Sequence, residues 1–269
     1  MKIRASTIVG IVIMLVLIAY VVMPIATVFL WAFAEKWTYP ALLPTEWGLR
    51  YWHTTLARAD VLSALRLSLA LSVTVTLLSA VICLPAAYAF ARMEFVGRRT
   101  FMMSFLAINA FPRFGLIVMI ATLFLSLRLV GTFWGIVLVQ LLNTMLIMIW
   151  LPSAAFRGVD RRLEEAARDV GAGPVRTFIR ITIPQAAPAI GAAMLLTFVS
   201  TFYETEGAWL VGAPKLRTMP MVMLQMITGQ IVVQYGAVLS VLLWVPSFIA
   251  LLFARRVLAS NQFAKGFGA

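Results

Sequence analysis

Six runs of apolar residues divide the chain, and we expect each to form a membrane-spanning helix. A bilayer core about 30 Å thick needs roughly 20 apolar residues in a helix that rises 1.5 Å per residue. The third run contains Pro112 and Arg113, and neighbouring helices can satisfy the backbone groups that a proline frees. The predicted fold is an all-α membrane protein, a single transmembrane domain over residues 1–269 with six transmembrane helices at about 5–34, 67–91, 101–127, 131–156, 186–202 and 235–254.

The first run has some features of a cleavable signal peptide. Lys2 and Arg4 precede it, and residues 32–34 read Ala-Phe-Ala, the small-x-small form of a cleavage site. However, the apolar core of a signal peptide is only about 7–15 residues long, and this run is much longer. We therefore expect an uncleaved first span.

Basic residues are distributed unevenly between the loops on the two sides of the membrane. Loops on the cytoplasmic side carry an excess of Lys and Arg, so the side with more of them is expected to be inside. One side has six: Lys36, Arg50, Arg58, Arg128, Lys215 and Arg217. The other has fourteen: Lys2, Arg4, Arg92, Arg98, Arg99, Arg157, Arg161, Arg162, Arg168, Arg176, Arg180, Arg255, Arg256 and Lys265. This bias predicts that both termini are cytoplasmic.

The composition excludes several classes of protein. The chain is 62% hydrophobic and 12% charged, whereas soluble domains have about 45–50% apolar and about 25% charged residues. A formal net charge of +12 could indicate a nucleic-acid partner, but the basic residues lie between membrane spans, so we expect none. Cys83 and His53 are the only residues of their kinds, which is too few for a zinc site.

The segment 157–184 is the polar interruption of an otherwise apolar chain, and its pattern predicts two short helices joined by a turn. Asp160 can cap the first helix, and Glu164 and Glu165 lie in its first turns, where the helix dipole favours negative charge. Gly171 suits a left-handed cap, and Pro174 suits the first turn of a second helix. Such a loop could be gripped by another protein; the alternative is an amphipathic loop lying on anionic lipid.

Residues 165–184 resemble the EAA signature of permease subunits of ATP-binding-cassette (ABC) importers. The family pattern is EAA, three residues, G, nine residues and I-x-L-P. This chain has EAA at 165–167, Gly171, and I-T-I-P at 181–184, so the one departure is Ile183 in place of leucine. Six spans with the EAA loop between two late ones also suit the type I importer permease fold, so the resemblance covers most of the chain.

The resemblance implies that this loop forms a coupling helix in a cleft of a cytoplasmic ATPase subunit. Glu165 would make polar contacts to that subunit or brace the loop, Ala166 and Ala167 would allow close packing, and Gly171 would make the turn. The residues assigned to ATPase coupling are Glu164, Glu165, Ala166, Ala167, Arg168, Asp169, Gly171, Ile181 and Pro184.

The resemblance also implies partners and a location. These are a dimer of ABC ATPase subunits that holds ATP and Mg, a second permease subunit, identical or related, and an extracytoplasmic solute-binding protein. The location is the lipid bilayer of the bacterial cytoplasmic (inner) membrane. The chain itself has no G-x-x-x-x-G-K-[ST] loop, His-based triad or metal motif, so we expect a non-enzyme with no cofactor of its own. The alternative is an ion-gradient-driven secondary carrier, which would more often show inverted repeats and ion-coupling acids.

A few polar residues in or near the spans are candidates for a substrate pathway. Ionisable groups within spans are costly and usually face a cavity or a partner. Arg113 could line a cavity where Pro112 breaks the third helix, or it could extend to the membrane surface. Residues 203–220 could form an outer gate or a solvated loop. The candidate pathway residues are Asn109, Arg113, Asn143, Tyr203 and Glu204.

The substrate class is left open by two conflicting resemblances. Residues 165–172 read EAARDVGA, which is similar to the polyamine, iron and phosphonate branch, whereas the sugar branch more often reads EAA-x-Ile-Asp-Gly-Ala. Residues 47–52 also favour the polyamine, iron and phosphonate branch. Residues 130–136, VGTFWGI, resemble sugar permeases instead. The expected substrate is a small polar solute, with a polyamine, phosphonate or similar charged molecule favoured over a sugar.

Overall fold

The computed structural model describes the backbone of residues 5–38, 40–229 and 232–259, and side chains within 9–38, 40–107, 110–229 and 232–253. The chain divides into two compact units, one formed from residues 1–62 and 222–245 and the other from 63–221 and 246–269. Five described helices are long and apolar enough to cross a membrane. Four of them lie within α1 (Ala5–Ala32), α3 (Ala59–Arg92), α6 (Phe133–Gly158) and α11 (Val233–Ala259), and the fifth begins at Pro174 and includes α9 (Ile183–Phe202).

The first unit joins the end of α1 to the beginning of α11. Ala32 of α1 is buried in a cluster with Ala237, Val238 and Val241 of α11. A two-stranded antiparallel sheet, β1 (Ala34–Lys36) with β2 (Glu46–Trp47), follows α1, and the short helix α2 (Arg50–Leu56) follows β2. The indole of Trp52 in α2 donates to the carbonyl of Ala32 at 2.7 Å, which ties α2 to the end of α1.

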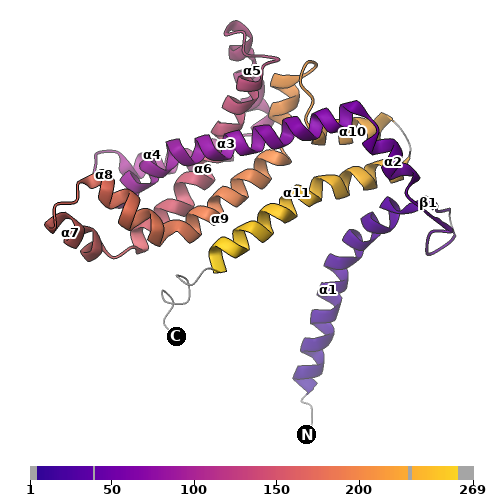
Figure 1. Ribbon diagram of the computed structural model, residues 1–269, viewed down its shortest axis with the longest axis horizontal. Helices are drawn as coiled ribbons and strands as arrows, with labels where there is room; N and C mark the ends of the chain where they lie inside the picture. The colour runs from indigo at the N-terminus through magenta and orange to yellow at the C-terminus, as the bar shows by residue number, and fades with distance from the viewer. Residues whose placement is uncertain (1–4, 39, 230–231, 260–269) are drawn as a thin grey trace. The chain divides into compact units, whose positions relative to one another are not determined.

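The second unit is built around α3, α6 and α9. Buried residues of all three helices form one apolar cluster, in which Cys83, Met148 and Ala193 meet. Polar side chains are buried between helices as well: the hydroxyls of Ser79 in α3 and Thr144 in α6 are hydrogen-bonded at 2.7 Å. Small and hydroxylated residues allow close packing of helices within a membrane, so this pattern fits a bundle that is largely transmembrane. Figure 1 shows the ribbons of α3, α6 and α9.

The expected third span, at about 101–127, is interrupted at Pro112, the residue where a break of this helix was considered. The chain forms α4 (Arg98–Ala110) and α5 (Arg113–Ser126), with a break at Phe111 and Pro112. Proline lacks a backbone N–H and disfavours helical backbone in the residue before it. Pro112 has an extended ψ of 110°, so the helix ends and restarts there.

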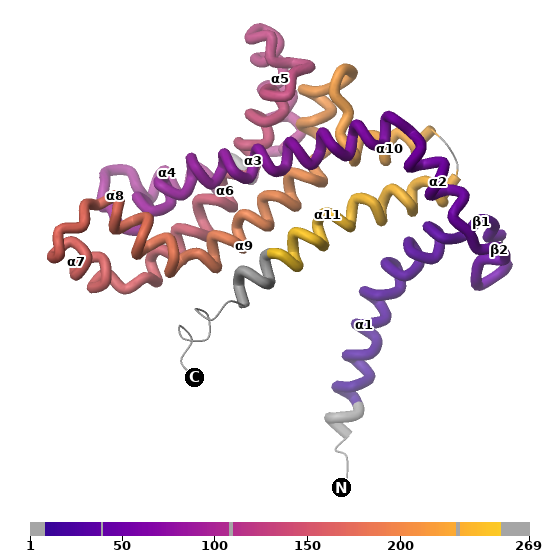
Figure 2. The backbone as a smooth tube through the Cα atoms, viewed as in Figure 1, coloured from indigo at the N-terminus to yellow at the C-terminus, as the bar shows by residue number. Residues whose placement is uncertain are grey.

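The expected pair of short helices in 157–184 is half correct. The first is α7 (Arg161–Asp169), but the second, α8 (Pro174–Thr177), continues through a π-helical turn, η1 (Phe178–Thr182), into α9. Figure 2 follows the chain from α6 through α7 and α8 into α9 at one end of this unit. A π turn often marks a local adjustment inside a helix, and here it ends at Thr182, two residues before Pro184, which cannot donate a backbone hydrogen bond.

Residues 203–220, expected to be a loop or gate, are partly helical. They contain a second π-helical turn, η2 (Ala208–Gly212), and the start of α10 (Met219–Gly229). The backbone N–H of Met219 donates to the hydroxyl of the buried Ser68 in α3 at 2.8 Å. This segment is therefore attached to the bundle of the second unit at its far end.

Candidate functional site: the loop between α6 and α9

The helix α7 has a defined cap at each end, as the sequence predicts. The Asp160 carboxylate accepts from the backbone N–H of Arg162 at 3.0 Å. At the other end Gly171 has a φ of +85°, and the N–H of Ala172 donates to the carbonyl of Ala167 at 2.9 Å. This arrangement is a Schellman motif, which satisfies the last carbonyls of a helix. The loop therefore has a fixed shape of its own.

A buried polar network fastens α7 to the bundle. Glu164 is only 5% exposed, and its Oε1 accepts from the Thr182 hydroxyl at 2.8 Å. The same oxygen lies 3.3 Å from Nη2 of Arg92 at the end of α3, and Oε2 accepts from the Tyr88 hydroxyl at 3.4 Å. One carboxylate thus connects α7 with α3 and with the π turn before α9. We call Glu164, Arg92, Thr182 and Tyr88 the brace.

Aromatic rings and largely buried side chains surround the brace. Tyr88 packs against the rings of Phe156 and Phe178, with centroids 5.8 and 4.8 Å away. Arg92 is also buried and donates to the carbonyl of Val159 as well. A buried charge is costly unless it is paired and hydrogen-bonded. Here the acid and the base are paired and each has a further hydrogen-bond partner, although Nε of Arg92 has none among the described groups.

The acid that forms the brace is Glu164, the neighbour of the residue for which a role was expected. Glu165, expected to contact the ATPase or brace the loop, has an exposed side chain, so only the bracing alternative is ruled out and contact with the ATPase stays a prediction. The other candidate coupling residues are divided between surface and interior. Exposed are Ala166, Arg168, Asp169, Gly171 and Pro184; half-buried are Ala167 and Ile181.

An apolar stripe on α7 faces away from the brace. Leu163 is 47% and Val170 85% exposed, and Ala166 between them is exposed too. Residues three and four apart lie on the same face of a helix, so the three side chains form one surface. Val175 and Ile179, just beyond the turn, are also exposed. A loop that buries one acid, Glu164, and exposes several aliphatic side chains on one face has the pattern of a docking surface.

The candidate pathway residues do not gather into one site. Arg113 is exposed at the first turn of α5, next to the break. Tyr203 is exposed at the end of α9. The side chain of Asn109 lies outside the described residues.

Two amides in α6 have unused hydrogen-bonding capacity. Asn143 is half-buried, and its Nδ2 has no partner among the described groups. Gln140, one turn earlier, is buried and donates to Oε2 of Glu204 at 3.2 Å, while its Oε1 has no partner in the same part of the structure. These two side chains could take part in further hydrogen bonds.

Glu204 has a structural task that its sequence position did not reveal. Its carboxylate accepts from the backbone N–H groups of Gly207 at 2.6 Å and Ala208 at 3.0 Å. It therefore caps the helical turn that leads into η2, in addition to receiving the Gln140 amide. Its acceptor sites are mostly occupied, which weakens its candidacy as a substrate ligand.

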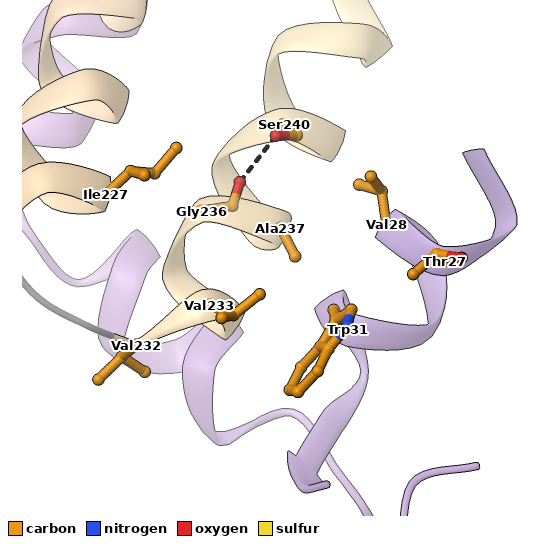
Figure 3. Close-up of a pocket in the computed structure, with 9 residues that line it drawn as sticks. All are labelled: Thr27, Val28, Trp31, Ile227, Val232, Val233, Gly236, Ala237 and Ser240. Atoms are coloured by element: carbon orange, nitrogen blue, oxygen red, sulfur yellow. Dashed lines mark hydrogen bonds between the residues drawn. The ribbon is translucent and has the colours of Figure 1, made fainter. Parts of the chain in front are cut away.

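A cavity in the first unit offers little to a polar solute. It has a volume of about 290 Å³, and side chains of α1 and α11 face each other across it, among them Val28, Trp31 and Ala237 (Figure 3). The hydroxyls of Thr27 and Ser240 are already bonded to carbonyls of their own helices. Within the described chain, no three His, Cys, Asp or Glu residues gather to hold a metal. The cavity is suited to apolar contacts.

Sequence reasoning missed Arg92, Tyr88 and Thr182 as parts of the site. Arg92 was counted only as one of the basic residues that set the topology. A weak signal was present: the side chains of two adjacent acids, Glu164 and Glu165, point in directions about 100° apart on a helix, so they cannot both face the bundle directly. Which one does so depends on the distant partners.

Comparison with known proteins identifies the same kind of protein at the level of the family and of single relatives. Residues 82–259 match the family model described as "Binding-protein-dependent transport system inner membrane component". The trehalose transport system permease protein SugB of Mycobacterium tuberculosis is 29% identical over 75% of this chain and 76% of its own. The trehalose/maltose transport system permease protein MalG of Thermococcus litoralis is 30% identical over 72% of each chain.

The structural comparison supports the same fold. A bacterial ABC transporter involved in the import of the acidic polysaccharide alginate has a chain with a TM-score of 0.71, 18% identity and coverage of 95% of this chain and 98% of its own. The relatives named above are sugar permeases, so the expected kinship with the polyamine, iron and phosphonate branch is corrected. The match over more than half of the residues shows that this chain belongs to the binding-protein-dependent transport system inner membrane components, the permease subunits of ABC importers.

Proposed function

We propose that this chain is the permease subunit of an importer for a neutral sugar, and that α7 receives the force generated by ATP hydrolysis. The observation that carries the coupling role is the two-sided construction of α7. One face exposes Leu163, Ala166 and Val170, and another buries Glu164 in the brace. A partner that displaces the exposed face must move the ends of α3 and α9 through the brace.

The proposed partners follow from this arrangement. Two ATPase subunits bind ATP and Mg and dock on α7 of each of two permease subunits, the second being another copy or a related chain. An extracytoplasmic binding protein delivers the solute on the opposite side. Glu165, Arg168 and Asp169, which are exposed beside the stripe, form the polar rim of the docking surface, since protein interfaces have apolar centres and polar rims.

A neutral sugar is supported by the relatives and by the chemistry of α6. Two relatives are permeases of trehalose or trehalose/maltose systems. Asn143 and Gln140 supply an amide donor and an amide acceptor without partners in the described structure, and such groups suit sugar hydroxyls. Glu204 is engaged in capping, so the attraction that a cationic solute would need is reduced.

Uptake by proteoliposomes tests the proposal. The chain is reconstituted with its ATPase, second permease subunit and binding protein, and radiolabelled trehalose, maltose, putrescine and a phosphonate are supplied outside. We expect uptake of one of the sugars that requires ATP inside and survives an ionophore. Uptake that follows an ion gradient without ATP would identify a secondary carrier instead, and ATP-dependent uptake of putrescine or the phosphonate alone would refute the substrate assignment.

A control variant separates the substrate assignment from coupling. Asn143→Ala is expected to lower sugar uptake by roughly tenfold, since an unsatisfied sugar hydroxyl costs about 1–2 kcal/mol. ATP hydrolysis in detergent without substrate should be unchanged. An Asn143→Ala variant that transports normally would remove this residue from the pathway while leaving the coupling role intact.

A further inference from the structure

A second, basic cavity lies apart from the brace, between the beginning of α4 and the end of α6. It has a volume of about 670 Å³, within the range of roughly 300–1,000 Å³ typical of ligand sites. Its wall combines three arginines, Arg98, Arg99 and Arg157, with Trp150 and the apolar side chains of Met102 and Met103. Neither the coupling surface nor the pathway candidates use these residues.

The electrostatics of this cavity favour a negatively charged ligand. Among the residues that line it in the described structure there is no Asp or Glu to balance the three guanidinium groups. Arg98 begins α4, directly after Gly97, which has a φ of +85° and also lines the cavity. The first N–H groups of a helix have no partners within it, and they attract anions together with the helix dipole.

Trp150 provides a separate indication of a missing polar partner. Its indole Nε1 is buried and has no hydrogen-bond partner in the structure described here, although its side chain lines the cavity. Buried donors are satisfied in the great majority of cases. An oxygen atom of a ligand held by the arginines would satisfy this donor after a small rotation of the ring that exposes Nε1 to the cavity.

We propose that this cavity binds the headgroup of an anionic phospholipid from the cytoplasmic leaflet. The phosphate would take the three arginines and the indole, and an acyl chain would lie along Met102 and the exposed Met103. All three arginines belong to the segments with the cytoplasmic charge excess. Basic pockets between transmembrane helices on this side suit anionic headgroups, and tryptophan is typical of the membrane interface. A soluble anion would leave the apolar half of the wall unused.

Lipid retention by the purified importer tests this proposal. The whole complex is exchanged into detergent containing dioleoyl phosphatidylglycerol or dioleoyl phosphatidylcholine, and bound lipid is measured by native mass spectrometry. We expect preferential retention of phosphatidylglycerol. The double variant Arg98→Gln/Arg99→Gln should lower its affinity by roughly 30-fold, since each basic residue near anionic lipid contributes about fivefold. Trp150→Phe, which keeps the ring and removes the donor, should lower it by about threefold.

The matched control removes the same charge elsewhere on the same side. Arg162→Gln/Arg176→Gln changes two exposed arginines of the loop and should leave retention unchanged. Equal losses in both double variants would mean a diffuse attraction and would overturn the site, as would equal retention of the two lipids. Displacement of the lipid by millimolar inorganic phosphate would indicate a soluble anion.

A crosslinking experiment covers the protein alternative. In a Cys83→Ser background, Arg99→Cys is treated with a bismaleimide in the intact complex. We expect no crosslink to the ATPase subunit. A crosslink would show that an ATPase segment fills the cavity and would also overturn the lipid proposal, without affecting the role of α7.

Discussion

Glu164 is a buried acid paired with a buried base, so its mutation should lower the stability of the protein. Removing one member of a buried ion pair typically costs about 3–5 kcal/mol, because the other is left uncompensated. We therefore expect Glu164→Ala to lower the free energy of unfolding by about 3 kcal/mol. Glu165→Ala, at an exposed position, should change it by no more than about 0.5 kcal/mol. Thermal unfolding of both variants in detergent measures this contrast.

A double substitution distinguishes a lost partner from lost packing. Replacing a buried pair with apolar residues of similar size is often neutral, so Arg92→Met/Glu164→Leu should recover most of the stability that Glu164→Ala loses. It should not recover ATP-driven uptake, because the polar link to Thr182 is gone. A double variant as unstable as Glu164→Ala would show that the ion pair is not the origin of the effect.

Glycine is favoured at position 171 by the backbone conformation and not by a lack of room for a side chain. Its φ of +85° is unfavourable for other residues, and a Cβ there would have no neighbouring atom within 4 Å. We expect Gly171→Ala to destabilise the loop by about 1 kcal/mol through strain alone. Gly173→Ala is the matched control, since Gly173 has an ordinary φ of −65° and equally open surroundings. Hydrogen exchange of the α7 amides should speed up in the first variant only; equal rates would contradict the role of Gly171.

Local chemistry explains which site residues could be predicted. Asp160 and Gly171 cap α7 through atoms of the same loop, so a few residues of sequence contain the information. Glu164 is bonded to Arg92 in α3 and Thr182 in η1. Whether Glu164 or Glu165 faces inward depends on where those distant groups lie, which no local pattern specifies.

At the scale of one helix, the exposed stripe of α7 predicts the effect of adding charge. Leu163→Glu/Val170→Glu leaves the brace untouched, so the folded permease should persist. A charge buried in an apolar interface is costly, so binding of the ATPase subunit should weaken at least tenfold, about 1.4 kcal/mol. Copurification of the two subunits, or their affinity by light scattering, provides the measurement.

The control for the stripe lies on the other side of the same helix. Arg161→Gln changes an exposed charged residue on the polar side of the helix, one turn before Glu165 of the rim. Charges at the rim of an interface contribute little, so ATPase binding should remain within about twofold. If both changes weaken binding equally, the docking surface is not the apolar stripe.

The break between α4 and α5 leads to an accessibility prediction. Arg113 is exposed next to this break, and broken helices at membrane depth are tolerated where they line a water-filled cavity. In a Cys83→Ser background, Arg113→Cys should therefore react with a membrane-impermeant maleimide. Val118→Cys, on the same helix and also exposed, should react at least tenfold more slowly if it faces lipid. Equal reactivity would place both positions in the same environment.

Apolar length predicted the spans well and helix continuity poorly. α1, α6 and α11 lie close to the expected ranges because a run of apolar residues marks the membrane-embedded part of a helix directly. Pro112 was considered as a break, whereas Pro184 entered only as the last residue of the EAA signature. Pro112 ends a helix, and Pro184 sits in a helix that continues after a π turn. The choice depends on whether neighbouring groups satisfy the freed carbonyls, which hydropathy does not report.

For the whole molecule, the orientation in the membrane remains the prediction with the widest consequences. The brace joins the end of α3 to the loop before α9, so Arg92 and α7 lie on the same side of the membrane. ATP is cytoplasmic, so coupling through α7 is possible only if that side is inside. The charge count of fourteen against six predicts this orientation independently of any coupling argument.

Reporter fusions measure the orientation at three points. Green fluorescent protein at the C-terminus should fluoresce, and alkaline phosphatase fused after Gly158 should be inactive, because both positions are expected inside. Alkaline phosphatase fused after Lys215 should be active, because that loop is expected outside. The reverse pattern would place α7 away from ATP and refute the coupling role, however well the brace and the stripe behave in the purified protein. A fluorescent C-terminus together with an active fusion after Gly158 would mean an odd number of spans between α7 and the C-terminus. That number would disagree with the two helices, α9 and α11, that are long and apolar enough to cross in this part of the described chain.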